Sequence, residues 1–140
     1  MKNVYEVFTE FESCKTKEDK LYVLRANSSW ALKNVLKGTF DPNVKFIFEQ
    51  APTYKKSDSP PGMSYSSLHK ELDRVYLFEI NSPRVDPNLS YKRKEQILIQ
   101  ILEVLEAQEA DVFMNMLLKK QKVKGLTYAI VKEAFPELLP

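Results

Sequence analysis

The sequence has few of the residues on which enzyme sites and disulfide-bonded folds depend. It contains one cysteine, one histidine and three glycines in 140 residues. The single cysteine, Cys14, excludes an internal disulfide bond, and the three glycines lie too far apart to form a glycine-rich phosphate loop. One cysteine and one histidine, His69, do not supply the four ligands of a closed zinc site. We therefore expect neither a metal nor a cofactor.

Long apolar runs are also missing, which excludes a membrane-spanning helix. The most apolar stretch, residues 97–105, is interrupted by Gln100 and Glu103 and is far shorter than the ~20 residues that cross a bilayer. The N-terminus has no cationic leader followed by an apolar segment. Together with the single cysteine, these features predict a cytoplasmic protein that contacts no membrane.

Acid–base and nucleophilic catalysis need groups that this chain hardly offers. A nucleophile requires a base beside it, and a general base is most often a histidine. Cys14 stands between two predicted helices, where we expect it to be inert, and His69 lies near a predicted helix start, where we expect a surface or packing role. We therefore predict a protein that is not an enzyme.

The residues that are present predict one all-α domain over residues 1–140. The apolar content of 44% and the charged content of 29% are typical of a globular protein, and a chain of this length can bury one core. Aromatic residues are spread along the chain and are expected to anchor that core, Tyr22 and Trp30 among them. Apolar residues recur at intervals of three and four, which predicts a bundle of six or seven short helices. The predicted helices cover residues 3–12, 16–24, 30–38, 66–80, 90–105, 108–117 and 127–135.

Two segments break this helical pattern. Residues 44–48 alternate after the turn at Asp41-Pro42-Asn43, which predicts a short extended segment. Residues 51–63 contain three prolines and a glycine among lysines and serines, which predicts a long Pro-rich loop. Neither segment divides the chain into separate cores.

A basic cluster precedes the last predicted helix. Exposed N–H groups at a helix start attract a phosphate, a glycine lets a backbone come close to it, and lysines add long-range attraction. The simpler interpretation is that the lysines complement a helix C-terminus and the glycine caps it. The candidate residues for binding a DNA backbone are Lys119, Lys120, Lys122, Lys124, Gly125 and Thr127. A second cluster, residues 92–94, lies in a first helical turn, where cations oppose the helix dipole, and this placement favours an anionic partner.

An acidic run spans the end of one predicted helix and the start of the next. Four carboxylates, Glu103, Glu106, Glu109 and Asp111, fall within nine residues. We interpret them as a solvated face, with Glu109 and Asp111 also favouring the following helix N-terminus. Binding of a cation or of a basic partner is the alternative.

Several segments resemble a known DNA-binding domain. The C-terminal stretch KVKGLTYAIVKEAFPELLP (residues 122–140), DVFMNML (residues 111–117), and ALKNVLKGTF (residues 31–40) followed by VKFIF (residues 44–48) resemble, in order, parts of the all-helical N-terminal domain of ATP-dependent DNA ligases. The resemblance is greatest to ligases of T-even bacteriophages, and the whole is also similar to short proteins of T-even-type phages of marine bacteria. It implies that Lys124, Gly125 and Thr127 stand where a helix N-terminus approaches the DNA backbone in the minor groove.

The sequence also differs from these ligases in one respect. The ligases continue into a nucleotidyltransferase domain with a Lys-x-Asp-Gly motif, and this sequence reaches Pro140 without one, so we expect neither adenylation nor sealing. The first functional hypothesis is a non-enzymatic, phage-encoded protein that binds duplex DNA through its backbone without strong sequence preference. The alternative is a protein–protein interaction module or phage regulator of a host or phage protein, which would use Tyr54, Lys55, Lys56 and Tyr65 of the Pro-rich loop.

Overall fold

The computed structural model describes residues 2–60 and 62–140, and within them it confirms the predicted all-α bundle. The α-helices are α1 (Val4–Ser13), α2 (Lys17–Ala26), α3 (Trp30–Phe40), α4 (Leu68–Glu71), α5 (Tyr91–Val104), α6 (Ala107–Leu117) and α7 (Tyr128–Ala134). A 3₁₀ helix, η1 (Leu72–Phe78), continues directly from α4.

Hydroxyl caps set the starts of three helices where the sequence predicts them. The Thr16 hydroxyl accepts a hydrogen bond from the Asp19 amide (3.1 Å), and Ser29 and Ser90 cap α3 and α5 in the same way. Each cap satisfies one of the amides that a helix start leaves without a partner. The interruptions between the early helices are therefore encoded locally.

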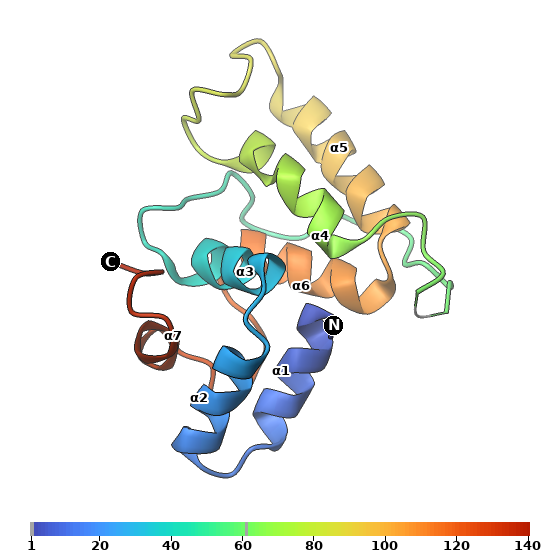
Figure 1. Ribbon diagram of the computed structural model, residues 1–140. Coiled ribbons are helices and arrows are strands. Elements are labelled where there is room, and N and C mark those ends of the chain that lie inside the picture. The colour runs from blue at the N-terminus through green and yellow to red at the C-terminus, as the bar shows by residue number, and fades with distance from the viewer. Residues whose placement is uncertain (1, 61) are drawn as a thin grey trace.

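Helices α3 and α6 pack against each other at the centre of the molecule (Figure 1). Gly38 makes their close approach possible, because a Cβ at this position would lie 2.7 Å from Sδ of Met116. Helices α1, α2 and α7 lie to one side of this pair, and α4, η1 and α5 lie to the other (Figure 1). Buried apolar residues from both sides form one hydrophobic core.

The extended segment at residues 44–48 is confirmed, and it docks against the end of η1. Ile47 N donates to Phe78 O (2.9 Å) and Ile80 N donates to Lys45 O (2.8 Å), with one isolated antiparallel bridge between Phe46 and Glu79. Phe48 packs against Phe78 with ring centroids 5.5 Å apart. The segment therefore adds aromatic side chains to the core rather than forming a sheet.

The helix predicted over residues 66–80 is wrong in type beyond its first turn. Only Leu68–Glu71 is α-helical, and the 3₁₀ helix η1 follows. Leu72, Val75 and Phe78 recur every three residues, which matches the three residues per turn of a 3₁₀ helix as well as it matches an α-helix. The apolar spacing alone therefore could not separate the two.

Three further expectations need correction. The third helix, predicted over residues 30–38, continues to Phe40, and Gly38 serves the contact with Met116 instead of ending the helix. Tyr22 is 71% exposed and Trp30 is 45% exposed, so neither anchors the core. Tyr22 lies on the outer face of α2 between the buried Leu21 and Val23, and Trp30 is the first residue of α3.

Among the described helices, none is long and apolar enough to cross a membrane.

Candidate nucleic-acid interface

The chain reverses direction directly after α6, at the start of the basic cluster. Lys119 N donates to Met116 O and Lys120 N donates to Asn115 O, both at 3.0 Å. These two bonds form a Schellman motif, in which the residue after the cap is usually a glycine in the left-handed region. Lys119 occupies that position with φ 62°, a backbone conformation that costs a residue with a Cβ about 1–2 kcal/mol.

The side chain of Lys119 explains why this conformation is retained. Its ammonium donates to the carbonyl oxygens of Gly38 (2.8 Å), Asp41 (2.6 Å) and Val44 (2.6 Å). Burial lowers the pKa of Lys119, and the Asp41 carboxylate opposes that shift. The prediction that Lys119 faces outward to a DNA phosphate is therefore wrong. It closes the C-terminal end of α3, since the last carbonyls of a helix have no partner within it.

The other three lysines of the cluster remain exposed. Lys120, Lys122 and Lys124 make no ion pair within the part of the chain that the structure describes. Lys122 borders an open hollow of about 360 Å³ that Asp111 also lines. Asp111 is bound there by Lys56 of the Pro-rich loop, with 3.1 Å between Nζ and Oδ1. Its negative charge is thus partly compensated beside Lys122.

Gly125 has the backbone that a glycine favours, and a lysine from another helix covers it. Its φ is +86°, and a Cβ at this position would lie 2.5 Å from Nζ of Lys20. The same ammonium lies 5.3 Å from the ring centroid of Phe11. Lys20 of α2 therefore joins the end of the basic cluster. No local sequence signal indicated this, because the contact links residues 105 positions apart.

Thr127 caps α7, as the predicted helix start required. Its hydroxyl accepts a hydrogen bond from Ile130 N (3.3 Å), and the same hydroxyl can still donate its own proton. The other end of α7 is closed by Arg25 of α2, which donates to the carbonyl oxygens of Glu133 (2.9 Å) and Ala134 (3.3 Å). Lys17 also pairs with the Glu133 carboxylate at 2.6 Å. Helix α7 is thus fixed to α2.

The second basic cluster does not join the first. Residues 92–94 form the first turn of α5, at the end of the molecule opposite α7 (Figure 1). Two lysines of α3 also have partners elsewhere. Lys33 lies over the ring of Phe135, 5.6 Å from its centroid, and Lys37 lies 3.9 Å from the Asp41 carboxylate. The structure therefore brings together Lys120, Lys122, Lys124 and Lys20 around the segment before α7, but not the cations of α5.

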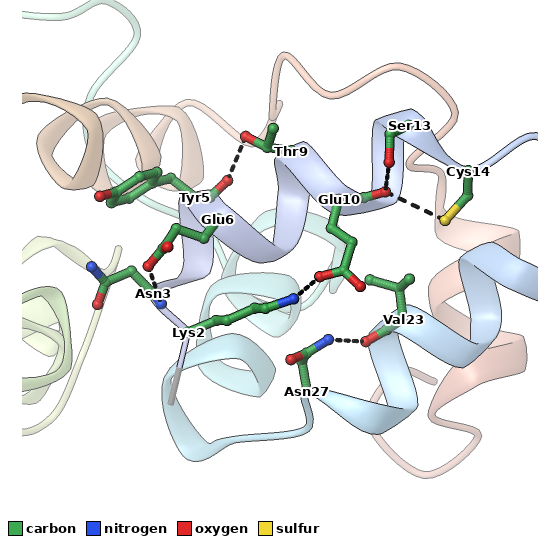
Figure 2. A network of polar contacts seen from close by, with 10 residues as sticks. All are labelled: Lys2, Asn3, Tyr5, Glu6, Thr9, Glu10, Ser13, Cys14, Val23 and Asn27. Atoms are coloured by element: carbon green, nitrogen blue, oxygen red, sulfur yellow. Dashed lines mark hydrogen bonds and ion pairs between the residues drawn. The ribbon is translucent and has the colours of Figure 1, made fainter.

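Cys14 and His69 are placed away from each other, and each has a structural neighbour. The Cys14 thiol donates to the Glu10 carbonyl oxygen at 3.3 Å (Figure 2). His69 packs against Trp30 with ring centroids 4.7 Å apart. Among the described residues, no three side chains of the metal-binding types gather in one place.

The interpretation of the acidic run as a solvated face is wrong for two of its members. Glu106 and Glu109 are 5% and 7% exposed. Glu106 accepts a hydrogen bond from the Tyr5 hydroxyl (2.9 Å), and Glu109 accepts one from the Leu68 amide at the start of α4 (2.8 Å). Glu103, which is exposed, accepts from the Lys55 amide (3.0 Å). The run therefore fixes other segments of the chain to α5 and α6.

One family model matches most of the chain. A family model described as "Family of unknown function (DUF6433)" matches residues 7–124. The chain belongs to this family. The matched range includes Lys119, Lys120, Lys122 and Lys124 and ends before Gly125 and α7. No curated protein matches the sequence.

Proposed function

We propose that the protein binds the backbone of duplex DNA without strong sequence preference and performs no catalytic step itself. The contacts come from Lys120, Lys122 and Lys124, with Lys20 and the turn at Gly125 completing the surface. Lysines supply such binding by displacing counterions from the phosphates. Contacts of this kind position a protein on DNA but do not read the base sequence.

The observation that carries this proposal is the set of exposed, unpaired ammonium groups before α7. Lys17, Lys37 and Lys56 each lie within 4 Å of a carboxylate. Lys120, Lys122 and Lys124 do not, within residues 2–60 and 62–140. Three cations in five residues, free of internal partners, give a local positive potential that a modest net charge of +2 does not reveal.

The resemblance to the ligase domain supports the same proposal from another direction. It points to Lys124, Gly125 and Thr127, and Gly125 adopts a positive φ, the backbone conformation that favours a glycine. The resemblance also underlies our proposal that the protein is phage-encoded and acts in the cytoplasm of an infected bacterium.

The proposal is tested by the affinity for a fluorescent duplex at low salt, measured by anisotropy. The test variant Lys120→Gln/Lys122→Gln/Lys124→Gln removes the three free cations. The matched control, Lys92→Gln/Arg93→Gln/Lys94→Gln, removes the same charge from the far end of the molecule. We expect at least tenfold weaker binding for the first variant and a smaller loss for the second. Equal losses, or no binding by the unchanged protein, would overturn the proposal.

A second candidate function, protein recognition by the Pro-rich loop, is favoured by two exposed side chains. Tyr65 is 92% exposed and Met63 is 72% exposed, and aromatic and Met side chains are enriched at protein interfaces. Tyr54 and Lys56 are less available, because Tyr54 is only partly exposed and Lys56 is bound to Asp111. Partners that stay bound to the protein after nuclease treatment, and are lost in Tyr65→Ala/Met63→Ala, would favour this candidate over DNA binding.

A further inference from the structure

Two nearly buried carboxylates line an open hollow at the start of α6. The hollow has a volume of about 360 Å³, and its walls include Glu106, Glu109 and Ser64. A second hollow of about 210 Å³ shares Glu109 and Ser67 with the first, so the two are adjoining. Val4, Ala31 and Leu68 line the second hollow, together with polar residues that include Lys2, Ser29 and His69.

Each carboxylate uses one oxygen inside the protein and leaves the other free. Oε1 of Glu106 accepts from the Tyr5 hydroxyl, and Oε2 of Glu109 accepts from the Leu68 amide. The second oxygens have no hydrogen-bond partner among the described residues. They are not fully buried, because Ser64 Oγ is the one buried side-chain atom without a partner in the described part of the chain. Both residues line the first hollow, and neither second oxygen is sealed from solvent.

No cation of the described chain balances these two charges. No Lys, Arg or His nitrogen lies within 4 Å of Glu106 or Glu109 across residues 2–60 and 62–140. Lys2 is turned toward Glu10, with which it pairs (Figure 2). Lys70 borders the first hollow but does not reach either carboxylate.

A buried carboxylate without a counter-charge is unfavourable unless a partner supplies one. Burial raises the pKa of Glu109, the Leu68 amide opposes this, and the charge of Glu106 raises it further. The Ser64 hydroxyl oxygen in the same wall also lacks a hydrogen-bond partner. The two carboxylates in this wall therefore lack a counter-charge among the described residues, and a cationic donor would supply one.

We propose that the adjoining hollows bind an alkylammonium group. Its ammonium would lie between the free oxygens of Glu106 and Glu109, since an ammonium has three donors and no acceptor. Its alkyl chain would lie along Val4, Ala31 and Leu68, a wall that a bare metal ion would not use. The group is carried either by a free polyamine or by a lysine side chain of a partner protein.

Titration calorimetry with two probes tests the proposal and separates the two sources. The probes are 1,4-diaminobutane and N-acetyl-lysine methylamide, whose only cation is the side-chain ammonium. Binding of either probe, weakened at least tenfold in Glu106→Gln/Glu109→Gln, supports the site. The better probe identifies the source. No binding of either at millimolar concentration, or equal binding by the double variant, overturns the proposal.

Two controls separate charge from structure. Glutamine keeps an acceptor for the Tyr5 hydroxyl and the Leu68 amide, so the double variant should remain folded by circular dichroism. Glu103→Gln removes an exposed carboxylate outside the hollow and should leave binding unchanged. If the double variant unfolds, carbon NMR of the unchanged protein decides, because a bound ammonium must lower the pKa of the Glu109 carboxyl. An unmoved pKa at a saturating probe concentration contradicts the proposal.

Variants at Lys70 and in the basic cluster are further controls for amine binding. Lys70→Gln should alter amine binding less than twofold, and a severalfold gain would mean that Lys70 already occupies the site. The Lys120→Gln/Lys122→Gln/Lys124→Gln variant should bind the amine normally, so loss of DNA binding and loss of amine binding are distinguishable.

Discussion

The ammonium of Lys119 lies 2.8 Å from the carbonyl oxygen of Gly38, so a residue of the loop after α6 closes the C-terminal end of α3. The Gly38 position also lacks a Cβ where Met116 of α6 packs against it. The same stretch of α3 is thus joined to α6 by side-chain packing and to the following loop by hydrogen bonds.

Lys119→Met is expected to lower the free energy of unfolding by roughly 2 kcal/mol, because it leaves three carbonyl oxygens without their charged donor. Lys119→Gly should lose about 1 kcal/mol less, since glycine adopts the left-handed backbone without the steric cost. Urea unfolding measures both. Lys120→Met is the matched control and should change stability little, because its side chain is exposed and forms none of these bonds.

Gly38→Ala should destabilise the protein by about 1–3 kcal/mol, because the added methyl group forces Met116 out of its packed position. Met116→Ala also costs stability by leaving a cavity. In the double variant the two changes should offset each other in part, since the new methyl group has space. A double-mutant cycle by thermal unfolding measures this coupling, and simple additivity would contradict the described contact.

Gly125→Ala and Gly62→Ala separate backbone strain from the placement of Lys20. Both glycines have positive φ, +86° and +81°, so each substitution should cost about 1 kcal/mol. Only at Gly125 would the new Cβ meet the Lys20 ammonium; nothing lies within 4 Å at Gly62. We therefore expect similar losses of stability and weaker DNA binding for Gly125→Ala alone. Equal DNA affinities of the two variants would remove Lys20 from the proposed surface.

Glu109 gives a pH dependence whose sign follows from its raised pKa. The folded protein holds this proton more tightly than the unfolded chain, so the contribution to stability is complete below the ordinary pKa of 4.5. It is lost as the pH rises through the folded-state pKa. Glu109→Gln should therefore flatten the decline in stability above pH 4.5, measured by urea unfolding across pH 4–8. The Glu103→Gln control should keep the decline of the unchanged protein.

The sequence predicted the helices well where local signals act. The caps at Thr16, Ser29 and Ser90 and the helix start at Thr127 need only a hydroxyl and a neighbouring amide, so they can be recognised from a few residues. The 3₁₀ character of η1 could not be predicted in this way, because residues spaced by three fit both helix types.

The site was less predictable, because its composition depends on contacts between distant segments. Lys119 looks like its neighbours in sequence, yet only it meets the end of α3. Lys20 belongs to α2, and only the folding of the chain brings it to Gly125. Glu106 and Glu109 look like surface residues, but the Tyr5 hydroxyl and the start of α4 cover them.

The salt dependence of duplex binding tests the DNA proposal most directly. For the unchanged protein, log affinity should fall linearly with log salt concentration by about 0.9 per phosphate neutralised. Lys122→Gln and Lys124→Gln should each reduce that slope by about 1, whereas Lys119→Gln should leave it unchanged. A slope that is the same in all three variants and the unchanged protein would contradict the assignment of these lysines to a DNA backbone.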